Sequence, residues 1–300
     1  MSETLAKGGG RISTGRRIIV LVWAMILTLV PCVAGLVVLA SRNIAGGFSA
    51  HLAPPSLSFY FALGEEPLAA LAAILAALGT YILLVRLAER RWPSELAPAF
   101  AIPELSLGIT AAALAFGLLM GVLTLSGAVV WRPTTSIDWY GALASGLPQG
   151  VFGGWLLGLA VQGGTARLAT RALGPVAGVV LAALLASWLV SPGWKLAPIL
   201  RVNATLGGAI LGLLWLRRQR LWLGLGLSTG WGALSGAVIG GPALFCAEDT
   251  SIYEPGRGIL IAWLRGTEGP ENSVLLLIGC VVGVGWLAWR AWKEGCFSKA

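Results

Sequence analysis

Residues 105–131 read LSLGITAAALAFGLLMGVLTLSGAVVW and contain no charged side chain. A helix needs about 20 consecutive apolar residues to cross a lipid bilayer, so this stretch predicts a transmembrane helix. It also contains Gly117 and Gly121, a pair of small residues four positions apart that is typical of helices packed together in membranes. Small residues recur inside other apolar stretches, at Gly150 and Gly154, at Gly208 and Gly212, and at Gly224, Gly226 and Gly230.

Seven more apolar stretches occupy the rest of the chain. They cover residues 18–41, 67–85, 139–166, 172–194, 199–216, 221–243 and 273–289. The chain of 300 residues is 57% hydrophobic and 11% charged, which lies outside the range of soluble globular domains. We predict an all-α, polytopic membrane bundle of about eight helices. We expect no ionisable residue at membrane depth, which argues against ion transport and proton relay.

The basic residues indicate how the predicted helices are oriented. With the chain divided in this way, 15 Lys and Arg residues fall on one side of the membrane and 6 on the other. The positive-inside rule places the richer side, with both termini, in the cytoplasm. Basic loops beside anionic lipid also account for the net charge of +8 without a nucleic-acid partner.

We expect a single membrane domain at residues 18–293, between a basic cytoplasmic segment at 1–17 and a cytoplasmic tail at 294–300. The first apolar run is longer than the roughly 7 to 15 residues of a signal peptide, so we expect it to remain as a membrane helix. The four cysteines have no paired spacing, and we predict neither a metal site nor a cofactor. The expected location is the bacterial cytoplasmic membrane.

Three segments occur in an order that resembles a known family of membrane proteins. The first contains Arg91–Leu96 (RWPSEL) and Glu104–Gly108 (ELSLG), and the second is Leu221–Gly232 (LWLGLGLSTGWG). The third contains Trp263–Gly266 (WLRG) and Gly269–Ser273 (GPENS). Together they resemble the CPBP family of CAAX proteases and bacteriocin-processing intramembrane glutamic endopeptidases. The resemblance implies a CPBP-like core over about residues 90–290.

The resemblance also implies catalytic motifs, which this chain lacks. The family motifs read Glu-Glu-x-x-x-Arg, Phe-x-x-x-His and His-x-x-x-Asn, in which a carboxylate activates water while His and Asn hold the water and the oxyanion. None of the substituted residues can take a proton from water near pH 7, so the resemblance implies a catalytically degenerate member. The corresponding positions here are Pro148, Gln149, Gly153, Leu184, Trp188, Ser228 and Gly232.

Polar side chains near these positions could line a small pocket between the fourth, fifth and seventh predicted helices. We expect Trp188 to fill part of the vacated volume. The interpretation that we favour is that these polar groups form hydrogen bonds from helix to helix, and a pocket is the alternative. The pocket residues would be Gln149, Ser187, Ser191, Ser228 and Thr229.

Three functions remain open from the sequence. The first is a non-catalytic binding protein, acting as a scaffold or accessory subunit of a membrane complex with a membrane-protein partner. The second is an intramembrane CAAX-type endopeptidase that uses divergent residues. The third is a bundle that binds lipid or a small molecule. The second function would need a loop carboxylate, for which the chain offers Glu65, Glu66, Glu268 and Glu271.

Overall fold

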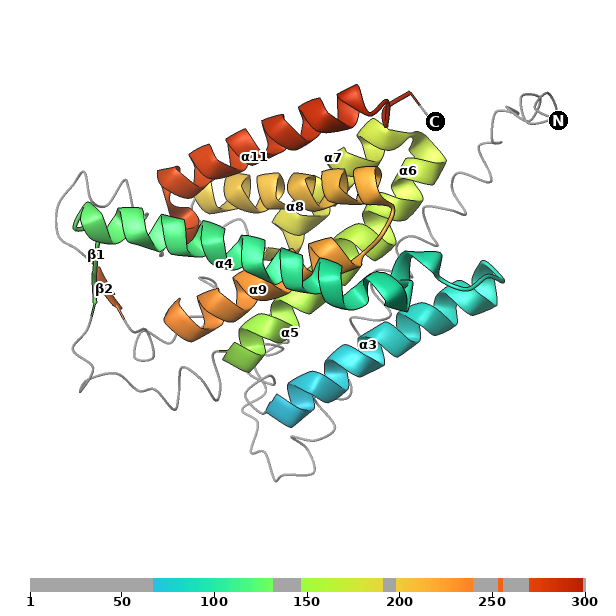
Figure 1. Ribbon diagram of the computed structural model, residues 1–300, viewed down its shortest axis with the longest axis horizontal. Helices are drawn as coiled ribbons and strands as arrows, with labels where there is room; N and C mark the ends of the chain where they lie inside the picture. Colours follow the sequence, from blue (N-terminus) through green and yellow to red (C-terminus); the bar gives the residue numbers. More distant parts are fainter. Residues whose placement is uncertain (1–66, 132–146, 191–197, 240–252, 256–269, 299–300) are drawn as a thin grey trace.

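A computed structural model gives the fold of the chain (Figure 1). The residues that it describes are 67–131, 147–190, 198–239, 253–255 and 270–298. The predicted N-terminal segment at 1–17 and the first predicted helix at 18–41 lie outside the described residues. Most described residues are helical, in agreement with the predicted helical class.

Each of the seven apolar stretches from residue 67 onward contains a helix. The longer helices are α3 (Pro67–Ala88), α4 (Ala101–Leu125), α5 (Leu147–Gly158), α6 (Arg167–Leu173), α7 (Pro175–Val190), α8 (Pro198–Arg218), α9 (Trp222–Ile239) and α11 (Val274–Lys293). Shorter helical segments are η2 (Ser94–Leu96), η3 (Pro98–Phe100), η8 (Pro270–Asn272) and the π-helix η6 (Leu159–Ala166). Strands β1 (Val129–Trp131) and β2 (Tyr253–Pro255) pair antiparallel, with Val130 opposite Glu254.

Local sequence signals explain three helix boundaries, namely the end of α6 and the starts of α7 and α11. The path of α5, η6 and α6 continues past the predicted end at residue 166, and it stops at Gly174, whose φ of 98° favours glycine. Pro175 then begins α7, a position that suits proline because its missing N–H would have no partner in the helix. Ser273 caps α11, since its Oγ accepts a hydrogen bond of 3.1 Å from the Leu276 N–H.

Four described helical segments are long and apolar enough to cross a membrane. By length and composition these are Ala70–Leu87, Ser94–Leu125, Pro198–Arg218 and Val274–Lys293. The apolar part of α7, Pro175–Leu189, is shorter. Many large apolar side chains on these helices are exposed, including Leu114, Leu118 and Leu125 on α4. In water such surfaces would be costly, whereas lipid solvates them, so these features indicate an integral membrane protein.

Helix α9 packs between α4 and α5 (Figure 1). Glycines allow these close contacts, because a Cβ at Gly150 would overlap the carbonyl oxygen of Gly232, and one at Gly154 would overlap that of Ser228. On the other side of α9, a Cβ at Gly226 would overlap the Leu105 carbonyl oxygen. The predicted role of these small residues in helix packing is therefore confirmed.

One predicted small-residue pair does not pack inside the molecule. A Cβ at Gly117 or Gly121 would meet no atom within 4 Å. Both glycines lie on the exposed face of α4, whereas its buried face carries Ala112, Phe116 and Leu123. The spacing of the pair matched a packing motif, but the larger apolar side chains turn the other face of α4 toward α9.

The helix ends gather at two ends of the bundle with different charge (Figure 1). At one, which we call the basic end, lie ten Arg and Lys residues and four glutamates: Arg86, Arg90, Arg91, Arg167, Arg171, Arg217, Arg218, Arg220, Arg290 and Lys293, with Glu89, Glu95, Glu104 and Glu294. The other charged residues that the structure describes are Arg201, Glu254 and Glu271, near the opposite end.

Candidate functional site

The basic end contains a charged cluster that is largely buried. We define the charged cluster as Tyr81, Glu89, Arg91, Glu95 and Arg167. Tyr81 comes from α3, Glu89 and Arg91 from the link that follows it, Glu95 from η2, and Arg167 from the start of α6. Segments far apart in the sequence therefore meet at this cluster.

Arg167 is the most buried member of the charged cluster, with a relative exposure of 0%. Its Nη2 lies 2.6 Å from Glu89 Oε1, and its Nη1 lies 3.3 Å from Glu95 Oε1. Its Nε donates a hydrogen bond of 2.9 Å to the Gly163 carbonyl oxygen. The guanidinium also lies over the Tyr81 ring, 5.7 Å from the centroid. Both carboxylates thus share one fully buried cation.

Arg91 closes the cluster from the solvent side. Its Nη1 donates to Glu95 Oε2 at 2.8 Å, its Nη2 to Glu95 Oε1 at 3.0 Å, and its Nε to Glu89 Oε2 at 2.7 Å. The Tyr81 hydroxyl donates to Glu95 Oε1 at 2.8 Å. Glu95 is therefore held by two guanidinium groups, and Glu89 by three, because Arg171 Nη1 also donates to Glu89 Oε2 at 3.2 Å. This arrangement offsets the cost of removing charge from water.

The electrostatics keep the outer part of the cluster charged. Burial alone would raise the pKa of Glu89, but hydrogen bonds and charges from Arg167 and Arg91 outweigh it and lower the pKa below the usual 4.5. The hydrogen bond to Glu95 raises the pKa of Arg91 against the effect of burial, and the bond to Glu89 adds to this. The arrangement therefore favours ion pairs over a carboxylate that could accept a proton from water.

The π-helix η6 leads directly into the charged cluster. Its Gly163 carbonyl accepts from Arg167, and a π-turn within an α-helix is often found at functional sites. Gln162 in the same segment is fully buried, and its Nε2 donates to the Leu211 carbonyl oxygen of α8 at 3.0 Å. A Cβ at Gly224 of α9 would overlap the Gln162 amide. Hence η6 ties α8 and α9 to the helix that carries Arg167.

Glu104 forms a second buried charged group at the basic end. It is 5% exposed, and its Oε1 lies 3.3 Å from Arg220 Nη1 and 3.5 Å from Arg218 Nη1. The guanidinium of Arg220 also stacks over Phe100, 3.8 Å from the ring centroid. This group joins the start of α4 to the link between α8 and α9.

The structure brings together two of the three motif positions assigned from the sequence. Pro148 and Gly153 lie on α5, and Ser228 and Gly232 lie on α9, where Gly154 and Gly150 pack against the Ser228 and Gly232 backbones. The Ser228 hydroxyl donates to the carbonyl oxygen of Gly224 at 3.0 Å, within its own helix. Thr229 is also buried. The backbone of Gln149 lies in α5, and its side chain falls outside the described part of the chain.

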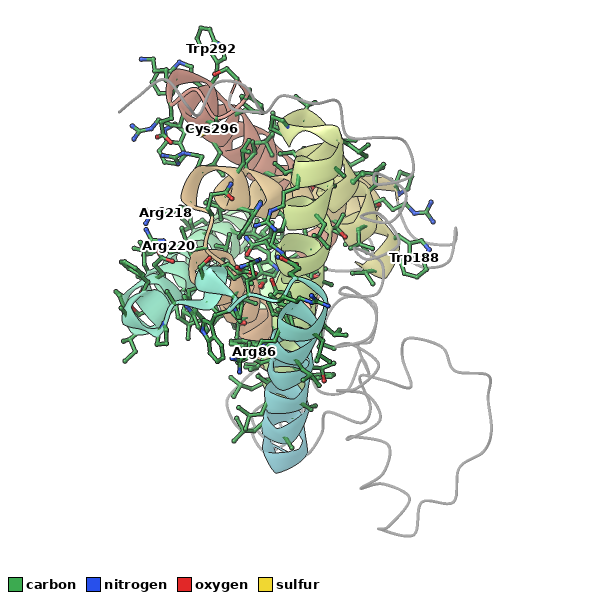
Figure 2. All side chains as sticks on the ribbon, turned by 90° about the vertical axis from the view of Figure 1, so that its right-hand side faces the viewer. Arg86, Trp188, Arg218, Arg220, Trp292 and Cys296 are labelled. Carbon is green, nitrogen blue, oxygen red and sulfur yellow. The ribbon has the colours of Figure 1, made fainter. Side chains whose placement is uncertain are left out.

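The residues of the remaining motif, Leu184 and Trp188, lie on α7, away from the contact between α5 and α9. Leu184 and Trp188 on α7 are 56% and 55% exposed, and α7 packs against α6 and α8. Figure 2 shows Trp188 projecting away from the bundle. Trp188 therefore does not fill a volume between α5 and α9, which corrects the expectation from the sequence. Ser187 is half-buried on α7, and Ser191 lies outside the described residues.

One loop carboxylate named from the sequence lies beside α9. Glu271 Oε1 accepts hydrogen bonds from Trp231 Nε1 at 2.9 Å and from Ser235 Oγ at 2.7 Å. Asn203 Nδ2 of α8 donates to the Glu271 carbonyl oxygen at 2.8 Å. Ser235 comes seven residues after Ser228, so about 10 Å of helix separates the two positions. Glu65, Glu66 and Glu268 lie outside the described residues.

The apolar stretches of the sequence did not predict the buried charges at the basic end. Arg167, Glu95 and Glu104 are all buried. The predicted apolar stretches stopped at residue 166 and began at residue 105, so they excluded Arg167 and Glu104 by one position each. The spacing of Arg91 and Glu95 was a usable signal, because charges four residues apart can face each other on a helical turn.

A metal site has no obvious ligands here, since the described residues contain no group of three or more His, Cys, Asp or Glu side chains able to hold a metal ion. No protein-family model matches the chain, and none of the curated proteins or solved structures compared with it matches either.

Proposed function

We propose that this chain is a non-catalytic, CPBP-like membrane protein that acts by binding, as a scaffold or accessory subunit of a membrane complex. It would cross a bacterial cytoplasmic membrane eight times, with both termini in the cytoplasm. The basic end would face the cytoplasm, because the described part of that end carries ten basic and four acidic residues.

The contact between α5 and α9 is the observation that carries this proposal. Two of the motif positions assigned from the resemblance meet there, and the helices touch through the backbone at Gly150, Gly154 and Gly232. Hydrolysis needs a base within reach of a water molecule and a substrate carbonyl. The described side chains at this contact include no ionisable group, and the Ser228 hydroxyl bonds to its own helix. The contact favours packing over hydrolysis.

The buried carboxylates support the same proposal. Glu89 is bound by three arginines and Glu95 by two, and Glu104 lies between Arg218 and Arg220. A general base should have a pKa near the working pH, whereas ion pairs with arginine keep a carboxylate charged and weakly basic.

The experiment is to extract the tagged chain gently from its own membranes at native abundance and to identify what purifies with it by mass spectrometry. A membrane protein of comparable length and abundance, carrying the same tag, serves as the control. A partner near one-to-one stoichiometry, absent from the control, would support a subunit or scaffold. A chain that purifies alone as a single species would contradict it.

Glu271 keeps the endopeptidase alternative testable, because its carboxylate lies against α9 at the end away from the charged cluster. Glu271→Gln retains an oxygen that can accept from Trp231 and Ser235 but cannot act as a base at neutral pH. The assay is cleavage of a prenylated CAAX peptide by the purified chain. If Glu271→Gln abolishes cleavage and Gln149→Ala does not, an endopeptidase becomes a better assignment than a binding protein.

A further inference from the structure

Four cations at the basic end lie over exposed tryptophan rings: Arg217 and Arg290 over Trp286, Arg86 over Trp92, and Lys293 over Trp289. The Arg86 guanidinium carbon is 4.7 Å from the centroid of Trp92, and Lys293 Nζ is 4.2 Å from that of Trp289. These tryptophans are 56% and 46% exposed. Tryptophan in membrane proteins prefers the depth of the lipid headgroups, and a cation over its face is held at that same depth.

The other seven cations at the basic end each form an ion pair with at least one of four carboxylates. Within the described residues, no carboxylate forms an ion pair with Arg86, Arg90 or Lys293. The paired cations are Arg91, Arg167 and Arg171 with Glu89 or Glu95, Arg218 and Arg220 with Glu104, and Arg217 and Arg290 with Glu294. Ten cations and four carboxylates leave six excess positive charges at this end, and Arg86, Arg90 and Lys293, which have no carboxylate partner among the described residues, carry three of them.

We propose that the Arg86–Trp92 pair and the Lys293–Trp289 pair each bind the phosphate of an anionic phospholipid. A lipid phosphate is the anion available at headgroup depth, and a net negative headgroup complements a cation that has no carboxylate partner. A zwitterionic lipid carries its own ammonium group and offers less complementarity. Such binding would be compatible with a subunit, an enzyme or a lipid-binding bundle alike.

The two pairs form separate sites. Arg86 lies in the last turn of α3 and Trp92 follows that helix, whereas Trp289 and Lys293 lie on α11. Figure 2 looks onto the basic end and shows Arg86 well apart from Trp292, the neighbour of Lys293, with Arg218 and Arg220 to one side. We expect two lipids to bind, one on each helix.

The experiment uses the full chain in a neutral detergent, titrated with phosphatidylglycerol or phosphatidylcholine, with bound lipid counted by native mass spectrometry. The test variant is Arg86→Gln with Lys293→Gln. The matched control is Arg171→Gln with Arg218→Gln, which removes the same charge from exposed but ion-paired residues, 53% and 44% exposed at their side chains. Retention of the thermal midpoint without lipid shows that each variant is folded.

The proposal expects two phosphatidylglycerol molecules to bind the unmodified chain more tightly than phosphatidylcholine does. The test variant should bind phosphatidylglycerol about fivefold more weakly at each site, as the loss of one basic residue near the surface predicts, and the control should change less. Equal loss in both variants would overturn the proposal in favour of diffuse attraction. Equal affinity for the two lipids, or displacement of lipid by millimolar inorganic phosphate, would also overturn it.

Discussion

Arg167 connects three parts of the chain through one side chain. Its guanidinium reaches Glu89 after α3 and Glu95 in η2, and its Nε reaches Gly163 in η6. A buried ion pair can be weakly stabilising as a whole, yet removal of one partner leaves an uncompensated charge away from water. The position should therefore tolerate substitution poorly.

We predict that Arg167→Met lowers the free energy of unfolding by about 3 kcal/mol, because Glu95 would keep its burial and lose one of its two cations. The measurement is thermal or denaturant unfolding in detergent, followed by tryptophan fluorescence. Arg171→Gln is the control, since Arg171 is more than half exposed and its pair with Glu89 should contribute less than about 1 kcal/mol. Equal effects of the two substitutions would contradict the role assigned to Arg167.

Protonation of Glu89 should make the stability of the fold depend on pH. Its pKa is lower in the folded chain than the usual 4.5, so its ion pairs stabilise the fold fully above that value. The stabilisation is lost as the pH falls through the lowered pKa, because the folded state must then take up a proton. We predict that the unfolding midpoints of the unmodified chain and of Glu89→Gln differ at pH 7 and converge below pH 4.5. A difference that stays constant over this range would refute the assignment.

At the scale of elements, backbone contact makes α5 and α9 a single unit. We predict that Gly154→Ala destabilises the chain by about 1 to 3 kcal/mol, because the added Cβ would overlap the Ser228 carbonyl oxygen and force the helices apart. Unfolding in detergent measures the change.

Gly117→Ala is the matched control for this contact, as it adds the same methyl group to a helical glycine with nothing within 4 Å. It should change the free energy of unfolding by no more than about 1 kcal/mol, and in the stabilising direction, because alanine has the higher helix propensity. A larger loss at Gly117 than at Gly154 would mean that α4 uses its open face for a contact outside the described chain.

The elements also show what apolar length and spacing can predict. Apolar length located a helix in every described stretch, since a helix that crosses a bilayer needs a long run without charge. Spacing predicted the contact at Gly150 and Gly154 but not the open face at Gly117, because four-residue spacing does not specify which face meets a neighbour. The π-helix at Leu159–Ala166 left no signal of this kind in the sequence.

Across the whole molecule, the distribution of basic residues indicates the ends of the bundle, whereas hydropathy does not indicate the charged cluster. Counting basic residues grouped the ends of α3, α6, α8 and α11, which the structure gathers at the basic end. The charged cluster was not predicted, because hydropathy treats a residue at the end of an apolar run as solvent-exposed. Here Arg167 is 0% exposed, since Glu89 and Glu95 fold back over it from another part of the chain. Such pairing over long sequence separation cannot be read from local composition.

The charge difference between the two ends leads to a prediction about orientation. If the basic end faces the cytoplasm, Ser298→Cys should be protected in intact cells from a thiol reagent that cannot cross the membrane, whereas Glu254→Cys should react. Ser298 follows α11 at the basic end, and Glu254 lies in β2 at the opposite end. Both would be introduced after replacement of Cys32, Cys246, Cys280 and Cys296 by serine.

Permeabilised cells provide the control for this measurement, because both cysteines should then react and show that protection came from the membrane and not from burial. The reverse labelling pattern in intact cells would show that the bundle has the opposite orientation in the membrane. The Arg86 and Lys293 pairs would then lie in the outer leaflet. The basic end would face outward, contrary to the positive-inside rule that most membrane helices follow. Orientation and lipid binding are therefore linked, since an anionic lipid can occupy these pairs only in the leaflet where the basic end lies.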